Sequence, residues 1–169
     1  MTNHKDSTME DIISQTKAEL VRAKQQMAHA LATTPDDRIN WSPSSTARTP
    51  VQQVSHGAKS LPGIQGMLVG KPFPYASVAE FDAALRVEDE ELKDREQVLS
   101  LLEKNSAEYL SWLDTLTPEQ LASMVQPPFG PPVPMAVGIT FAAYHLRFHI
   151  AQMDYLQTIY GDRDWHMEG

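Results

Sequence analysis

Two histidines four residues apart, His145 and His149, are the residues of this chain best suited to metal chemistry. Side chains at positions i and i+4 of a helix are neighbours, with Cβ atoms roughly 5–6 Å apart, so both imidazoles can ligate one ion. We expect both to lie on the apolar seam of a helix, where burial favours the neutral ring that a metal needs. The spacing also occurs without a metal. The alternative is therefore a pair of core histidines bonded to carbonyls or water.

Two familiar histidine motifs are excluded. Leu146 follows His145 at the position where a zincin metalloprotease carries its glutamate base. No Glu-x-x-His sequence occurs, so the motif of the ferritin-like di-iron carboxylate proteins is missing. The chain also has no cysteine, which excludes disulfides, thiolate ligands and cysteine nucleophiles.

A third ligand must come from another segment, and His56 is the best candidate because it lies about two turns into a predicted helix. The other histidines are weaker candidates. We expect them, respectively, in a disordered N-terminus, on the surface and beyond the last helix: His4, His29 and His166. The sequence therefore predicts a metal site made of His56, His145 and His149.

The elements that must position these residues are helical. Apolar residues recur at helical spacing in four segments, and none shows a convincing strand pattern: about 7–32, 50–70, 87–116 and 135–160. Between the last two we expect a short turn of helix to about 124, begun by a second capping-box sequence at Thr117 to Gln120, and then an irregular loop over 127–134. The connections are long, so we predict an all-α fold, a four-helix bundle with long crossover connections. One domain should span 1–169, with 1–6 disordered.

Local signals predict where these helices begin and end. Ser7 to Glu10 has the form of a capping box, and Thr49 followed by Pro50 and Gln52 is the clearest helix start. Pro62-Gly63 should kink or weaken the second helix. The acidic run over 88–94 is interpreted as the solvated start of the third helix.

Composition excludes several classes of function. The net charge is −8 and no basic cluster occurs, so a nucleic-acid partner is not expected. No stretch approaches the ~20 consecutive apolar residues of a membrane-spanning helix, and the N-terminus lacks the apolar run of a secretory signal. We therefore expect no membrane partner and a cytoplasmic location.

Three landmarks together resemble the DinB-like four-helix-bundle proteins, from the first helix to the end of the last. The first is a Trp-x-Pro link at Trp41-Ser42-Pro43, and the second is His56 at its distance after Thr49-Pro50. The third is a His-x3-His-x2-Gln run closed by a Tyr-Gly pair: His145, His149, Gln152, Tyr160 and Gly161. Ile150-Ala151 and Pro62-Gly63 depart from the usual family pattern, and the second pair could alter the pocket.

The resemblance implies three histidine ligands on a divalent metal ion, zinc or nickel, with iron or manganese as further options. It also implies a homodimer and, by analogy with characterised relatives, transfer of a low-molecular-weight thiol to a small-molecule substrate. Three neutral histidines leave positions open on the ion, as in catalytic sites, and a thiol bound there would ionise. No general base can be named.

Two other classes of function compete with a metal-dependent thiol S-transferase. One is a non-catalytic metal-binding protein of the same fold that takes part in a stress response through a partner. The other is a haem protein, which is disfavoured because histidines one turn apart on one helix suit a single small ion better than the two faces of haem. Gln152 is expected to orient a ligand or to serve packing.

Overall fold

Four long helices form the bundle that the sequence predicts. The structure, a computed structural model, describes residues 4–166, with side chains described from residue 10 onward. The bundle helices are α1 (His4–Thr33), α2 (Pro50–Leu68), α4 (Arg95–Leu113) and α7 (Phe141–Ile159). The expected class, an all-α bundle with long crossover connections, is confirmed.

The caps read from the sequence are present at two helix starts. The Thr49 side chain accepts from the Gln52 backbone N–H, and Gln52 Oε1 accepts from the Thr49 backbone N–H at 2.9 Å. Thr117 and Gln120 form the same box at α5 (Pro118–Ala122). α1, in contrast, already begins at His4, ahead of the capping box expected at Ser7.

The proline in α2 does not interrupt that helix. Pro62 lies within the continuous helix that ends at Leu68. Leu61 and Leu68, before and after the proline, are buried in the core. This packing stabilises the helical conformation on both sides of Pro62 against the loss of one backbone hydrogen bond.

The predicted third helix over 87–116 is wrong at its start. The structure has two helices there, α3 (Val78–Asp89) and α4, and the acidic run contains the end of α3 and the capping residue of α4. Ser77 caps α3 by accepting from the Glu80 N–H, and Asp94 caps α4 by accepting from the Gln97 N–H. The run is not a solvated helix start throughout, because Asp89 is buried.

The loop expected over 127–134 is irregular through residue 132, and a small two-stranded hairpin encloses it. β1 (Met124–Val125) pairs antiparallel with β2 (Val133–Pro134). The predicted fourth helix is also divided, because α6 (Met135–Gly138) ends before α7 begins. At the break, the buried Tyr109 hydroxyl donates to the Ile139 carbonyl at 3.1 Å and satisfies this backbone group.

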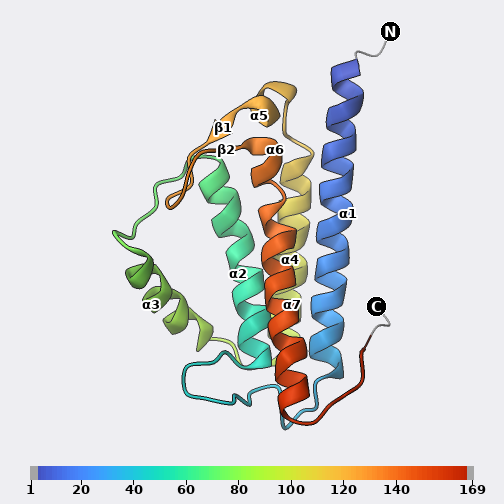
Figure 1. Ribbon diagram of the computed structural model, residues 1–169, viewed down its shortest axis with the longest axis vertical. Helices are drawn as coiled ribbons and strands as arrows, with labels where there is room; N and C mark the ends of the chain where they lie inside the picture. The colour runs from blue at the N-terminus through green and yellow to red at the C-terminus, as the bar shows by residue number, and fades with distance from the viewer. Residues whose placement is uncertain (1–3, 167–169) are drawn as a thin grey trace.

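The order of the bundle helices in space differs from their order along the chain. α7 packs against α1 and α2, and α4 packs against the other faces of the same two helices. α2 and α4 run in the same direction, and α1 and α7 run in the opposite one (Figure 1). Parallel neighbours need a return connection, and α3 lies in that connection, outside the bundle and beside α2.

Two of the sequence landmarks meet at one end of the bundle. The ring of Trp41 packs edge-to-face against the ring of Tyr160, with 6.0 Å between centroids. The Arg38 guanidinium lies over both rings. This contact ties the first crossover connection to the end of α7. Within residues 4–166, no helix is both long and apolar enough to cross a membrane.

Candidate metal centre

The three predicted histidines converge between α2 and α7. His56 comes from α2, and His145 and His149 come from successive turns of α7. The ring centroid of His56 lies 5.2 Å from that of His145 and 4.7 Å from that of His149. One nitrogen from each ring lies within 4.8 Å of the others, so the three can share one ion.

The closest pair of nitrogens has the separation that a shared metal requires. His145 Nε2 and His149 Nε2 lie 3.2 Å apart. Two imidazoles that ligate one zinc ion, each at about 2.0–2.1 Å, hold their nitrogens roughly 3–3.5 Å apart. Without a metal, one ring can donate a hydrogen bond to the other at the same distance. The donor set therefore fits a divalent ion, and metal binding itself stays a prediction.

Burial keeps two of the rings neutral. It is the main cause that lowers the pKa of His145 to about 4 and that of His149 to about 3. Neighbouring histidines and the positive charge of Arg48 add to both shifts. Both imidazoles are therefore unprotonated at neutral pH, the state in which a histidine binds a metal.

Two amide groups orient the ring of His149. Its Nδ1 lies 2.6 Å from Gln53 Oε1 and 3.2 Å from Gln152 Oε1. Amide oxygens accept hydrogen bonds, so Nδ1 carries the ring proton and donates to them. Nε2 is left with its lone pair directed toward the other histidines, as the ligands of a metal site require.

A buried carboxylate faces His56 from α3. Asp89 Oδ1 lies 3.6 Å from His56 Nδ1, and Asp89 Oδ2 accepts from Arg48 Nε at 2.6 Å. Burial by itself would raise the pKa of Asp89, but its contacts with His56 and Arg48 outweigh that effect and lower it. The ionised Asp89 thus holds His56 with its Nε2 left for a metal.

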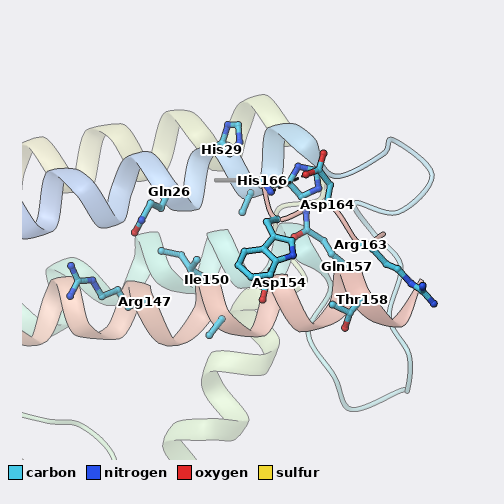
Figure 2. A pocket seen from close by; sticks show the side chains of 13 residues that line it. Gln26, His29, Arg147, Ile150, Asp154, Gln157, Thr158, Arg163, Asp164 and His166 are labelled. Atoms are coloured by element: carbon cyan, nitrogen blue, oxygen red, sulfur yellow. Dashed lines mark hydrogen bonds between the residues drawn. The ribbon is translucent and has the colours of Figure 1, made fainter. Parts of the chain in front are cut away.

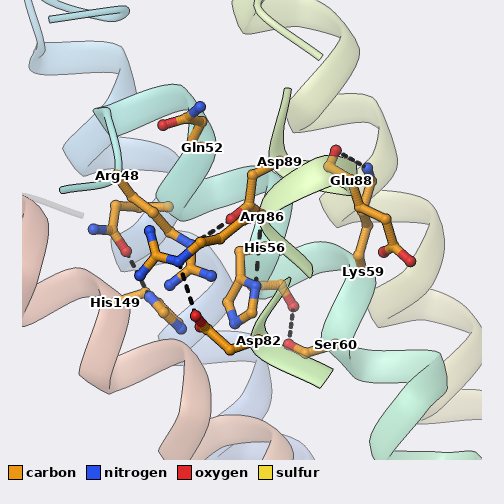
Figure 3. A network of polar contacts seen from close by, with 12 residues as sticks. Arg48, Gln52, His56, Lys59, Ser60, Asp82, Arg86, Glu88, Asp89 and His149 are labelled. Carbon is orange, nitrogen blue, oxygen red and sulfur yellow. Dashed lines mark hydrogen bonds and ion pairs between the residues drawn. The ribbon is translucent and has the colours of Figure 1, made fainter. Parts of the chain in front are cut away.

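Side chains from α2 hold the end of α3 in this position (Figure 3). Lys59 Nζ donates to the Glu88 carbonyl at 2.6 Å and forms an ion pair with Glu91. Gln52 donates to the Glu90 carboxylate at 2.6 Å. The buried carboxylate of Asp89 is therefore held beside His56 by several contacts between α2 and the end of α3.

The comparison with protein families agrees with this geometry. The model of the DinB superfamily matches residues 19–153, which is most of the chain and includes all three histidines. The chain belongs to the DinB superfamily. The resemblance drawn from the sequence landmarks is confirmed.

Three solved structures share the fold of this DinB-superfamily protein. The mycothiol-dependent maleylpyruvate isomerase superposes with a TM-score of 0.67 at 12% identity, covering 83% of this chain and 60% of that one. A protein described as the sibling lethal factor precursor DfsB gives 0.69 at 17% identity, covering 88% and 96%. YfiT from Bacillus subtilis, described as a probable metal-dependent hydrolase with an unusual four-helix-bundle topology, gives 0.61 at 20%, covering 95% and 90%.

These likenesses establish the fold alone. The chain spans only 60% of the isomerase's length. The comparison with curated proteins found no match. The activity of this DinB-superfamily protein must therefore be argued from its own residues.

Sequence reasoning missed three residues of this DinB-superfamily site. Gln53 had a usable signal, because it lies three positions before His56 and so on the same face of a helix. Arg48 precedes the helix cap, where nothing in the sequence distinguishes it. Asp89 was hidden in the acidic run, and its burial depends on how α3 packs.

The buried seam of α7 does not follow the helical spacing from His145 and His149 to Gln152. Leu146 and Met153 are fully buried, whereas Gln152 is exposed. His149 faces the interior and His145 lies at its edge, half-buried. Gln152 nevertheless contacts His149, so the expectation that it orients a ligand is supported by geometry.

Two tyrosines of the bundle and the remaining histidines do not belong to the site. Tyr109 is buried near the break before α7, and Tyr144 is exposed and packs on Phe148. His29 and His166 line a cavity of about 740 Å³ between α1, α7 and the C-terminal segment (Figure 2). The side chain of His4 lies outside the described part of the structure. Residues 4–6, expected to be disordered, form the start of α1, and the disorder expected for residues 1–3 stays a prediction because these lie outside the described residues.

Proposed function

We propose that this protein is a divalent-metal enzyme that transfers a low-molecular-weight thiol to a small electrophilic substrate. The observation that carries the proposal is the convergence of three nitrogens from His56, His145 and His149 within 4.8 Å. Three neutral nitrogen ligands leave positions on the ion open for a substrate. The metal would ionise a thiol bound at such a position.

The chain's own residues supply a prepared site for that chemistry. Hydrogen bonds from His149 to Gln53 and the contact of His56 with Asp89 fix the orientation of two rings before any metal arrives. This arrangement reduces the cost of organising ligands, and it is typical of functional metal sites.

An adjoining cavity can hold the second substrate. A cavity of about 580 Å³ borders the site through Arg48, Gln53 and Gln152. Its other wall is formed by the side chains of Phe148, Tyr155 and Leu156, among others. The volume suits a small organic molecule, and the mixture of apolar walls with a few polar groups is usual for substrate pockets.

A thiol-consumption assay tests the proposal. Protein loaded with zinc or nickel is mixed with a thiol and a panel of electrophiles, and loss of free thiol is followed. We expect faster consumption than in buffer with free metal, and loss of that rate in His149→Ala. A wild-type protein that holds metal yet leaves every thiol rate unchanged would contradict the transferase.

Two other functions use the same centre. Metal-bound water instead of a thiol would make the protein a hydrolase, the activity suggested for YfiT. A non-catalytic metal-binding protein with a stress-related partner would use only the ion. Hydrolysis of activated esters without thiol would favour the first. Stoichiometric metal with neither activity would favour the second.

We also infer that the protein forms a homodimer, which light scattering on the purified protein would test. We also retain the cytoplasm as the location, which cell fractionation would test. The choice between zinc, nickel, iron and manganese requires measuring the metal in protein purified without chelator, because histidine sites follow metal availability as well as affinity.

A further inference from the structure

Arg48 is a buried cation with an unused donor. Its side chain is only 16% exposed, and its Nε donates to Asp89 Oδ2 at 2.6 Å. Its Nη2 is buried and has no hydrogen-bond partner among the residues that the structure describes. A buried polar group without a partner is unfavourable, and such groups are uncommon in folded proteins. The position therefore indicates a partner that the chain itself does not supply.

Asp89 does not supply that partner, because neither of its oxygens lies within hydrogen-bond reach of Arg48 Nη2. Oδ2 accepts from Arg48 Nε, and Oδ1 faces His56 Nδ1. One carboxylate thus accompanies one guanidinium and the charge of a divalent ion. The centre as a whole would be positively charged when the metal is bound, and a bound anion would balance it.

Arg48 also borders space that a ligand could occupy. It lines the cavity of about 580 Å³ beside His149, and it lines a second, more polar cavity of about 340 Å³ next to Asp89. It is close enough to the rings for its charge to contribute to the lowered pKa values of His145 and His149. A molecule held at the three histidines would therefore lie near the guanidinium.

We propose that Arg48 binds a carboxylate group of the molecule held at the metal centre, so that the substrates of this protein include small carboxylic acids. This inference rests on the proposed function. A guanidinium offers paired N–H groups in a planar fork that matches a carboxylate. The cavity next to Asp89 is lined by three cations and two carboxylates, Arg48, Arg86, Lys93, Asp89 and Glu90, and the one positive charge left over suits a group of one negative charge better than a phosphate dianion.

The experiment compares two thiols that differ by a carboxylate. Mercaptoacetate and 2-mercaptoethanol are titrated calorimetrically into zinc-loaded protein at neutral pH, and acetate is titrated into the protein already saturated with 2-mercaptoethanol. In Arg48→Gln we expect the affinity for the carboxylate probe to fall roughly ten- to hundred-fold, while that for 2-mercaptoethanol is unchanged. Arg48→Lys keeps a charge beside Asp89 and protects the test against a folding defect.

Arg95→Gln is the matched control. Arg95 also forms an ion pair with a carboxylate, that of Asp36 at 2.7 Å, and its side chain is 27% exposed, but it lines neither of the two cavities. The same loss of charge there should leave all three affinities unchanged. If Arg48→Gln weakens the binding of mercaptoacetate, the carboxylate that Arg48 binds belongs to the thiol. If Arg48→Gln weakens the binding of acetate, that carboxylate belongs to the second substrate.

Several outcomes would overturn the inference. Equal losses for both thiols in Arg48→Gln and Arg48→Lys would mean that Arg48 only supports Asp89 and His56. Equal affinity of the wild type for the two thiols, with no acetate binding, would exclude a carboxylate site. Tighter binding of inorganic phosphate than of acetate would exclude the assigned class of anion. Failure of the wild type to retain zinc is a separate readout, which would remove the proposed function and this inference together.

Discussion

Asp89 Oδ1 lies 3.6 Å from His56 Nδ1, although the two residues belong to different helices, α3 and α2. The relationship exists because α2 and α4 are parallel, and the chain must return along the bundle between them. α3 forms part of that return, and its last residue is the buried carboxylate. A candidate metal ligand is thus held by the connection that the bundle's topology requires.

Asp89→Asn should weaken metal binding by roughly ten- to hundred-fold, the usual effect of losing a group that orients a ligand. The amide loses the charge that attracts His56 and Arg48. Competition with a coloured chelator measures the affinity. Glu96→Gln, an equal change of charge at an exposed position in the first turn of α4, is the control and should bind as the wild type does. Equal affinities of both variants would show that Asp89 does not support the centre.

His149→Ala should abolish stoichiometric metal, because it removes the ring that is most firmly oriented. Metal content by mass spectrometry, on tag-free protein purified without chelator, measures the change. His29→Ala is the control, since His29 lies in the cavity beside α1 and away from the three ligands. A wild type that stays free of metal and refuses added zinc or nickel would make His145 and His149 hydrogen-bonded core residues.

Gln53→Leu should lower metal affinity by about tenfold, because the Nδ1–H of His149 loses its closer acceptor. Gln152→Leu should have a smaller effect, as that contact is 3.2 Å long and lies at an exposed position. A double-mutant cycle tests whether the two amides replace each other at Nδ1. Additive losses would mean that they act independently.

The metal-free protein should lose stability as the pH falls below about 6.5. The folded-state pKa values of His145 and His149 are lowered to about 4 and about 3, so the unfolded chain binds more protons between these values and 6.5. Stability from these groups is present above pH 6.5 and lost on acidification, by about 2 kcal/mol per histidine between pH 7 and pH 5. Urea unfolding at several pH values measures it. The double variant His145→Gln/His149→Gln should show a flatter profile.

Tyr109→Phe should destabilise the protein by about 1 kcal/mol without changing metal content. It removes the donor to the Ile139 carbonyl at the break before α7 and leaves that carbonyl buried. A lower midpoint of urea unfolding at unchanged slope is the expected result. Tyr144→Phe, at an exposed position, should change stability by less than about 0.5 kcal/mol.

The parts of the site that could be predicted are those with local causes. The two histidines of α7 face one point because helical geometry brings positions i and i+4 together. The hydrogen bonds between Thr49 and Gln52 fix where α2 begins, and therefore how many turns into the helix His56 lies. The prediction of one helix over 87–116 was wrong because the acidic run was interpreted as a single helix start. Ser77 in fact caps α3, which ends in this run, and Asp94 caps α4.

What the sequence by itself determined, then, is the four bundle helices in outline, the caps of α2 and α5 and the three histidines, because these depend on periodicity and on bonds between residues a few positions apart. Only the tertiary structure decided that α2 lies beside α7 and that Gln53, Asp89 and Arg48 surround the rings. Those contacts join segments far apart in the chain, and the packing of the crossover connection brings them together. The burial that lowers the pKa of His149 has the same origin.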